Sequence, residues 1–315
     1  MKRHQQILAA VLLLQVILTM IVFWPQPAVT GKGELLFPNL TATEIVSLEI
    51  TDEQGNRLAL NKGADGWVLP EADDYPVQDS VITPVLESLV SLDTGNLVAQ
   101  SAAAQQQLQV AEDDFVRRLI WQTAEGNAYL VYLGSAPRYT ATHFRVEGQD
   151  ETYLTEDLSS WQLRTEVASW VETSYLDLLA NELTSVTLEN SHGAFNFSKD
   201  EADDWTLDDL AADEIVNASQ IAEIVRKGSF VSLQQPLGKS AEASYGMADP
   251  SAVITLRDAE GAHTLTIGAH WADKQSYVLK ASDSEYYVTG SATLLQPLVE
   301  SAREDFLQLE PPPTE

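Results

Sequence analysis

The chain has no cysteine among its 315 residues. Disulfides, thiolate catalysis and cysteine-ligated zinc or iron–sulfur sites are therefore excluded. Folded parts of this chain must be held together by their apolar cores, and a chain of this length can bury enough surface to do so.

Basic residues are also scarce, because 18 Lys and Arg face 47 Asp and Glu, for a net charge of −29. Binding to nucleic acid or to anionic lipid headgroups depends on cations that neutralise phosphates, so we expect no nucleic-acid partner. A solvated, self-repelling surface is the simplest explanation of the charge. A cationic partner or a high-salt habitat is the alternative.

Familiar catalytic sequences are missing as well: there is no nucleophile elbow, H-E-x-x-H, Walker loop or G-x-G-x-x-G. His263 and His270 are seven residues apart, which places them on opposite faces of a strand and poorly for sharing a metal. The acidic clusters lack the turn glycine of a calcium loop. These clusters are 112–114, 200–204 and 208–214. We expect no metal, no cofactor and no enzymatic activity.

One long apolar run, Ile7 to Trp24, stands out and has no successor of similar length. At 1.5 Å per helical residue it covers most of a hydrocarbon core of roughly 30 Å. Lys2 and Arg3 precede it, which predicts a cytoplasmic N-terminus. The sequence therefore predicts a stub and single-pass anchor over residues 1–24, with the bulk of the chain extracytoplasmic. A cleaved signal peptide remains the alternative, although no A-x-A site follows the run.

Residues 25–40 are rich in Pro and Gly and are typical of a tether, after which the apolar pattern alternates between strand and helix periods. Strands are expected over 45–51, 58–60, 67–69, 115–121, 129–133, 143–146 and 152–155. An apolar stripe from Val81 to Val90 predicts a helix. A second stripe of Leu163, Val167, Trp170 and Val171 predicts another helix ending near Tyr175.

The same order then begins again. Trp67 is matched by Trp205, the Gly134 strand end by that at Gly268, and Tyr153 by Tyr287. The separation between matches drifts slowly in one direction, as small loop deletions would produce. We therefore expect an α+β fold of two tandem, duplicated units over 41–180 and 181–310, with mainly antiparallel sheets and helices on one face. A tail occupies 311–315. The glycines after the two matched strands are interpreted as turn residues.

Several short motifs follow one another in this arrangement. They are Leu36-Phe37-Pro38, Gly66-Trp67-Val68-Leu69, Tyr75-Pro76-Val77, Tyr245-Gly246-Met247-Ala248-Asp249-Pro250 and Leu265-Thr266-Ile267-Gly268. With the N-terminal run they resemble family 4340 of the domains of unknown function. The first half departs from the pattern, with Leu108-Gln109-Val110 standing roughly where Tyr-Gly is found in the second. The resemblance implies a protein of the bacterial cytoplasmic membrane and an accessory role beside an ABC transporter of the gliding-motility type. It implies no catalytic residues.

Candidate contact residues come from what the repeat leaves unmatched. Trp67 and Trp205 are matched, which favours core packing, whereas Trp161, Trp170 and Trp271 are not. These three are the better candidates for a contact surface, although core packing remains the more ordinary explanation. The positive stretches Arg117-Arg118 and Arg138-Tyr139 are candidates for holding an anion.

Three functional hypotheses follow. The first is a non-enzymatic, membrane-anchored accessory or binding protein that works with ABC transporter subunits in the same membrane. The second is a free-standing envelope ligand-binding protein with its site between the two units. The third is a hydrolase that uses acidic side chains, which requires a cleft with close carboxylates of perturbed pKa.

Overall fold

The computed structural model describes residue 15 and residues 33–308. The predicted anchor, apart from Gln15, lies outside the described residues, as do residues 25–32 of the predicted tether. Among the described residues, no helix is long and apolar enough to cross a membrane.

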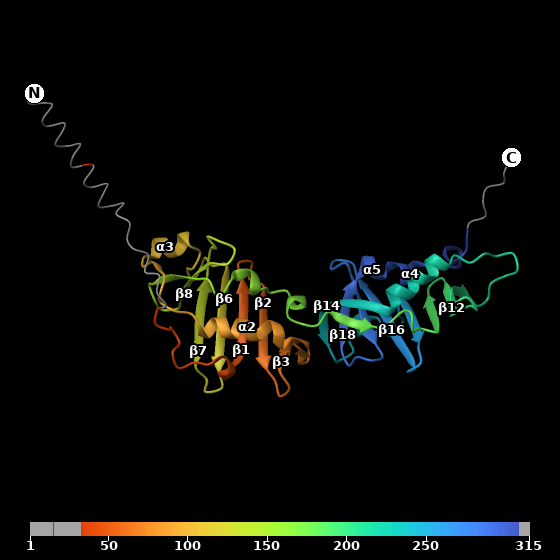
Figure 1. The fold of residues 1–315 in the computed structure, drawn as a ribbon, viewed down its shortest axis with the longest axis horizontal. Helices are drawn as coiled ribbons and strands as arrows, with labels where there is room; N and C mark the ends of the chain where they lie inside the picture. Colours follow the sequence, from red (N-terminus) through yellow and green to blue (C-terminus); the bar gives the residue numbers. More distant parts are fainter. Residues whose placement is uncertain (1–14, 16–32, 309–315) are drawn as a thin grey trace, which may run out of the picture.

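Residues 45–155 form the first of two nine-stranded sheets, in which all neighbouring strands are antiparallel (Figure 1). The order across the sheet is β4-β3-β2-β1-β6-β7-β8-β9-β5. The strands are β1 (Ile45–Asp52), β2 (Arg57–Lys62), β3 (Trp67–Leu69), β4 (Tyr75–Pro76), β5 (Leu97–Ala99), β6 (Arg117–Thr123), β7 (Ala128–Leu133), β8 (Thr142–Val146) and β9 (Thr152–Thr155).

The second sheet is also antiparallel, with the order β10-β14-β18-β17-β16-β15-β11-β12-β13. Its strands are β10 (Ser174–Asp177), β11 (Ser185–Asn190), β12 (Gly193–Lys199), β13 (Trp205–Leu207), β14 (Phe230–Gly238), β15 (Ala252–Arg257), β16 (Ala262–Trp271), β17 (Ser276–Ala281) and β18 (Tyr287–Ser291). We call the parts that carry the two sheets the first and the second unit. They lie side by side along the longest axis of the molecule (Figure 1).

The two sheets follow one plan. Read from β3, the first runs β3-β2-β1-β6-β7-β8-β9-β5, and the second, read from β13, runs β13-β12-β11-β15-β16-β17-β18-β14. Each strand thus has a counterpart at the same place in sheet and chain. Two strands fall outside the plan: β4 extends the first sheet beyond β3, and β10 extends the second beyond β14.

Few helices accompany the sheets. They are α2 (Asp79–Val90), α3 (Ala102–Gln107), α4 (Ala218–Ser229) and α5 (Ala292–Glu300). In α2 the predicted stripe is confirmed, because Ile82, Val85, Leu86 and Leu89 are buried. In α4, Asn217 caps the helix by accepting a hydrogen bond from the Gln220 N–H. The buried residues of α4 include the predicted stripe Ile221, Ile224 and Val225.

The helix predicted from Leu163 to Tyr175 is wrong. This stretch contains only the 3₁₀ turn Val167–Ser169 and the start of β10, with a second 3₁₀ turn, Ser160–Gln162, just before it. Its carbonyls are used by side chains: Arg117 Nε donates to the Leu163 oxygen at 2.7 Å and Trp170 Nε1 to the Arg164 oxygen at 2.9 Å. Of the apolar side chains that suggested a stripe, Leu163, Trp170 and Val171 are buried and Val167 is partly buried.

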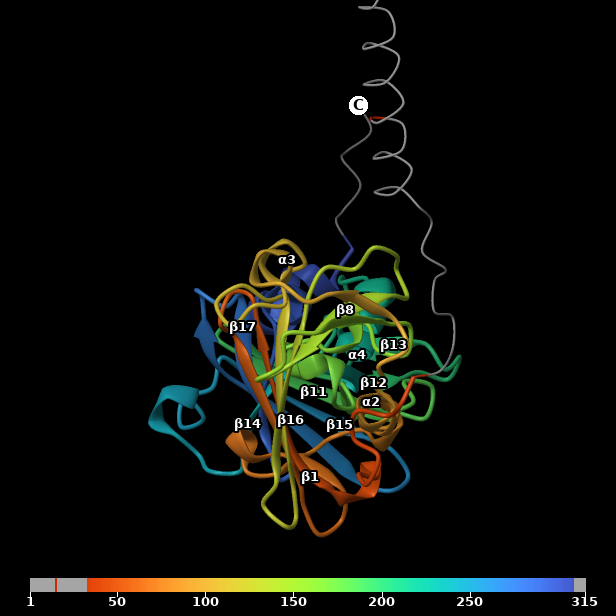
Figure 2. The same ribbon diagram turned by 90° about the vertical axis from the view of Figure 1, so that its left-hand side faces the viewer.

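The motif Leu36-Phe37-Pro38 packs on the first unit. The Phe37 ring meets Trp121 and Tyr129 edge-on, with centroids 5.3 and 5.2 Å away. Buried apolar side chains of both units belong to one connected core cluster. Seen down the long axis, the two sheets overlap (Figure 2). The chain therefore has an apolar connection between its two units as well as within each.

Candidate functional site at the junction of the two units

A hydrogen bond between an aspartate side chain and a backbone N–H ties the first unit to the end of β14. The turn after β3 carries Asp73 into the left-handed region, with φ of 51°. From there its Oδ2 accepts a hydrogen bond from the Lys239 N–H at 2.7 Å. Gly238, at φ of 108°, allows the close approach, because a Cβ there would lie 2.6 Å from Asp73 Oδ2. The sequence thus provides a residue without a side chain where the units meet.

Three tyrosines extend the contact. The Tyr286 hydroxyl donates to the Asp74 oxygen at 3.0 Å, and its ring meets Tyr75 with centroids 4.6 Å apart. The Tyr175 hydroxyl donates to the Tyr286 oxygen at 2.6 Å. Burial raises the pKa of Tyr75 to about 12 and raises that of Tyr175. The buried phenols therefore stay neutral and keep their donor protons at physiological pH.

A cleft of about 370 Å³ lies beside these contacts, and we call it the junction cleft. It draws on both units and on the turn between them, and its lining residues are Arg57, Leu58, Ala59, Leu69, Glu71, Ala72, Thr165, Glu166, Val167, Gln234, Gln235 and Pro236. Charged side chains of both signs, uncharged polar side chains and apolar side chains all line the cleft. This lining is suited to a polar ligand that is held by hydrogen bonds.

A second hollow of about 430 Å³ lies on the same joint and is strongly acidic. Asp65, Asp73, Asp74 and Asp79 line it together with Lys239 and Tyr286. The Lys239 ammonium pairs with Glu285 at 2.9 Å and lies 4.8 Å from the Tyr286 ring centroid. The pKa of Lys239 is raised, chiefly by its hydrogen bond with Glu285. Its cation is therefore already engaged by the protein.

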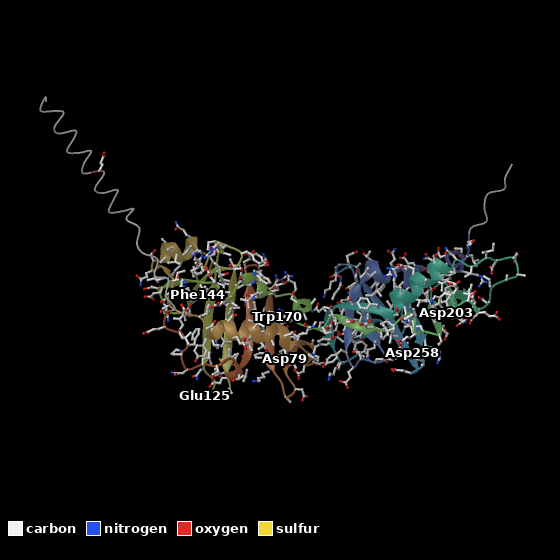
Figure 3. All side chains as sticks on the ribbon, viewed as in Figure 1. Asp79, Glu125, Phe144, Trp170, Asp203 and Asp258 are labelled. Atoms are coloured by element: carbon white, nitrogen blue, oxygen red, sulfur yellow. The ribbon has the colours of Figure 1, made fainter. Side chains whose placement is uncertain are left out.

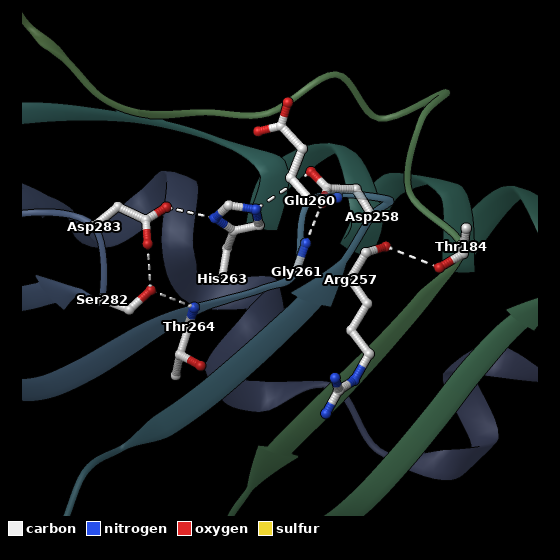
Figure 4. Close-up of polar contacts among 9 residues, drawn as sticks. All are labelled: Thr184, Arg257, Asp258, Glu260, Gly261, His263, Thr264, Ser282 and Asp283. Carbon is white, nitrogen blue, oxygen red and sulfur yellow. Dashed lines mark hydrogen bonds and ion pairs between the residues drawn. The ribbon is translucent and has the colours of Figure 1, made fainter.

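Another set of interacting titratable groups lies on the second sheet (Figure 4). His263 sits between two carboxylates: its Nδ1 is 2.5 Å from Asp283 Oδ2, and its Nε2 is 3.3 Å from Asp258 Oδ2. The pKa of His263 is raised, first by the hydrogen bond with Asp283. The pKa of Asp258 is lowered, first by the Gly261 N–H and then by that of Glu260.

The cluster of His263, Asp258 and Asp283 links two turns and does not activate a nucleophile. The Ser282 hydroxyl donates to Asp283 Oδ1 at 2.7 Å and accepts from the Thr264 N–H at 3.0 Å, so it does not point at the imidazole (Figure 4). Asp258 belongs to the turn between β15 and β16, and Asp283 to the turn between β17 and β18. The geometry is that of a charged clip between neighbouring hairpins.

The other histidine of the predicted pair is occupied differently. His270 stacks on Tyr277, with ring centroids 4.7 Å apart. Within the described ranges, no group of three or more His, Asp or Glu side chains is placed to hold a metal ion.

The three candidate tryptophans have different surroundings. Trp161 is exposed and stacks on Tyr139. Trp271 is partly buried, with the Lys274 ammonium 4.8 Å from its ring centroid. Trp170, labelled in Figure 3, is wholly buried, so its assignment to a contact surface is wrong and the core alternative holds. Its carbonyl also accepts from the Gln78 N–H at 2.8 Å, which fixes the turn segment to the start of α2.

The candidate arginines do not form a shared anion site. Arg117 donates hydrogen bonds from Nε to the Leu163 oxygen and from Nη1 to the Val116 oxygen. Arg118 reaches Glu49 at 3.9 Å, and Arg138 pairs with Glu156. Each guanidinium has its own partner within the first unit.

Sequence reasoning missed the residues that build the junction. Asp73, Asp74 and Tyr286 have no repeated counterpart to draw attention to them, and their partners are more than 160 residues away along the chain. The one available signal was Tyr75-Pro76, an extended pair directly after two aspartates. It marked a turn but gave no indication of a partner.

Comparison with known proteins gives one result. A family model described as a domain of unknown function (DUF4340) matches residues 67–235, from β3 of the first unit to β14 of the second. No curated protein and no solved structure matches the chain. The matched range therefore includes the turn at Asp73 and, of the β14 residues that line the cleft, Gln234 and Gln235.

Proposed function

Since this chain belongs to the DUF4340 family of domains of unknown function, which is matched over residues 67–235, we propose that it is a membrane-tethered, extracytoplasmic accessory module of an ABC-type transport system. In this proposal residues 1–24 anchor the chain in a bacterial cytoplasmic membrane, and the two units stand outside. The module catalyses no reaction. Its partners are transporter subunits in the same membrane.

The observation that carries the proposal is the built junction. Tandem units on a single chain need not be locked together, but here the hydrogen bond from the Lys239 N–H to Asp73, the contacts of Tyr286 with Asp74 and Tyr75, and a shared apolar core join them. Two rigidly joined units on a single membrane anchor are suited to bridging or positioning membrane partners, because rigid binding surfaces lose less entropy on association. The apolar run and the positive residues before it support the tether.

Crosslinking in native membranes, followed by purification of the full chain, tests the partnership. ABC transporter subunits should be recovered with the wild-type chain and lost with a variant lacking residues 1–24. Recovery of no transporter subunit, in cells that carry the partner genes, would contradict the proposal.

The orientation has a separate test. Protease added to intact spheroplasts should degrade the two units while a cytoplasmic control protein survives. Protection of the units, with a known extracytoplasmic protein degraded in the same sample, would show that the chain faces the other way.

A second candidate function is ligand binding in the junction cleft, and the mixed polar lining contributed by both units favours it. Gln234 and Gln235 are exposed there, and in the described part of the chain neither side-chain amide has a hydrogen-bond partner. They are therefore free to bind a polar small molecule.

A thermal-shift screen against polar envelope metabolites addresses this candidate. A ligand of the cleft should raise the melting temperature of the wild type, with a smaller rise in Gln235→Ala. Gln107→Ala is the matched control, because Gln107 is equally exposed but lies on α3 away from the cleft. Equal loss of the shift in both variants would place the ligand elsewhere.

A further inference from the structure

A third hollow, in the first unit, differs from the others in its charge. It measures about 460 Å³, and its lining residues are Ser80, Val81, Pro84, Val85, Trp161, Gln162, Arg164 and Ser169. We call it the Trp161 groove. None of these residues is acidic, although Asp and Glu outnumber Lys and Arg by 47 to 18 in the chain. The groove lies between the outer face of α2 and the turn segment that follows β9.

Trp161, which lines this groove, belongs to an exposed aromatic pair with Tyr139. Trp161 and Tyr139 are 45% and 73% exposed, and their rings stack nearly parallel, with centroids 5.3 Å apart. Keeping two large rings partly in water forgoes part of the free energy that their burial would yield. Solitary exposed apolar residues are common, but a stacked pair beside a hollow marks a binding surface.

The pair is held in place by its backbone. The Ser159 N–H donates to Gln162 Oε1 at 2.9 Å, which caps the 3₁₀ turn that carries Trp161. The Ser159 hydroxyl donates to the Tyr139 oxygen at 3.4 Å and so links the Tyr139 loop to the same turn. The indole therefore presents a pre-organised surface, which lowers the entropy cost of binding.

Unused polar groups surround the rings. Within the described residues, the hydroxyls of Ser80 and Ser169, the amide nitrogen of Gln162 and both terminal nitrogens of Arg164 make no hydrogen bond to protein; of the Arg164 guanidinium, only Nε donates, to the Trp161 oxygen. The groove thus combines a flat apolar plane with a rim of donors and two hydroxyls that also accept.

We propose that the Trp161 groove binds a neutral saccharide. A sugar ring has an apolar C–H face that packs on an indole and a circumference of hydroxyls that exchange hydrogen bonds with such a rim. The charge of −29 disfavours anionic ligands, which only Arg164 would attract inside the groove. A cation would find no carboxylate in the lining. The volume suits one or two sugar rings.

A proline-rich peptide is the other class of ligand that aromatic grooves take. Such peptides dock across rings spaced along a groove. Here Trp161 is the one aromatic residue in the lining, and Tyr139 stacks on it. The geometry therefore favours one ring-sized ligand face over an extended proline helix.

The test is titration calorimetry on the full-length chain with cellotriose, maltotriose, mannotriose and chitotriose, in a detergent without a sugar headgroup. At least one trisaccharide should bind the wild type. Trp161→Ala should weaken that binding tenfold or more, whereas Trp161→Phe, which keeps an aromatic plane, should stay within about threefold. Phe230→Ala is the matched control, because Phe230 is an exposed aromatic residue of the second unit.

Three results would overturn the proposal. They are no heat of binding with any of the four trisaccharides, binding that Trp161→Ala leaves unchanged, and binding of a proline-rich peptide in their place that Trp161→Ala abolishes. Circular dichroism of each variant distinguishes loss of the groove from loss of the fold. Because Trp161 is exposed, its replacement leaves the core intact.

Discussion

At the scale of single residues, the tryptophans show how little a residue type says about its role. Trp161 and Trp170 are nine positions apart in one turn segment, yet one lies in water and the other is wholly buried. Neither has a matched partner in the second unit, so the repeat pattern could not separate them. The difference arises from the 3₁₀ turns, which no helical or strand period describes.

Replacing these two tryptophans should therefore have unequal effects on stability. Trp170→Ala empties a core position and breaks the hydrogen bond to the Arg164 oxygen, and should cost about 3–5 kcal/mol of the free energy of unfolding. Trp161→Ala loses only its stack with Tyr139 and should cost about 1 kcal/mol or less. Urea unfolding of both variants measures the contrast, and equal losses would mean that the turn segment is packed differently.

His263 gives the protein a pH-dependent contribution. Its pKa in the folded state lies above the ordinary value of 6.5, first because of the hydrogen bond with Asp283. The contribution is therefore complete below pH 6.5, where the unfolded state also binds the proton, and is lost as pH rises through the raised folded value. The carboxylates remain ionised over this range, because the pKa values of Asp258 and Asp283 are both lowered from 3.8.

His263→Gln should accordingly destabilise the protein most near pH 5.5–6.5, by about 1 kcal/mol as for other partly exposed ion pairs. The difference from wild type should shrink steadily toward pH 9. Melting temperatures over this range measure it, with His192→Gln as control, because His192 is exposed and has no carboxylate partner among the described residues. A difference that grows with pH would reverse the assignment.

At the scale of elements, the repeat is visible in backbone conformation where the sequence barely shows it. Gly134 directly follows β7 and Gly268 lies within the equivalent strand β16; a Cβ on them would lie 2.0 Å from the Leu108 oxygen and 2.1 Å from the Tyr245 oxygen. The glycines are thus needed for close approach, and their interpretation as turn residues is wrong, because neither lies in a turn. These contacts support the weak alignment of Leu108-Gln109 with Tyr245-Gly246, because Leu108 and Tyr245 supply the two oxygens.

The equivalence extends to the next residue, because Gln109 and Gly246 are both left-handed, at φ of 56° and 68°. Glutamine is strained there and glycine is not. Gln109→Gly should therefore leave stability unchanged or raise it by up to about 1 kcal/mol. Gly246→Ala should lower it by about 1–3 kcal/mol, because a Cβ would meet the Ala269 nitrogen at 2.8 Å. Thermal unfolding tests both, and a matching loss in the two variants would argue against equivalent backbones.

Alternating strands were the most predictable elements. The strand expected at 152–155 coincides with β9, and that at 129–133 lies within β7. β14 was missed, because Gln234, Gln235 and Pro236 interrupt its alternation and it needs two β-bulges to pair with β18. Local pattern thus predicts the regular strands of a sheet and fails where pairing is irregular, which is also where the junction cleft lies.

At the scale of the whole molecule, the junction could not be predicted from the sequence, because its contacts depend on how the two units pack against each other. Gly238 allows a direct test of that docking. Gly238→Ala should cost about 2–4 kcal/mol, from positive φ and from the clash with Asp73 Oδ2. Gly55→Ala is the matched control: its φ of 85° is also positive, but nothing lies within 4 Å, so it should cost only about 1 kcal/mol.

A double-mutant cycle with Asp73→Ala then isolates the contact between units, read from urea unfolding. Asp73→Ala should cost less in the Gly238→Ala background than in the wild type, since the hydrogen bond to the Lys239 N–H is already disturbed there. Additive losses would show that Asp73 and Gly238 do not meet in solution.

The position of β10 decides how the chain can be divided. This strand precedes the boundary expected between residues 180 and 181, yet it pairs with β14 and so belongs to the second sheet. A fragment that starts at residue 181 would leave the backbone of β14 uncovered from Phe230 to Ser232, open to pairing with other molecules. A fragment that starts at residue 173 would keep β10, which covers this edge of β14. It is therefore the better choice for producing the C-terminal half alone.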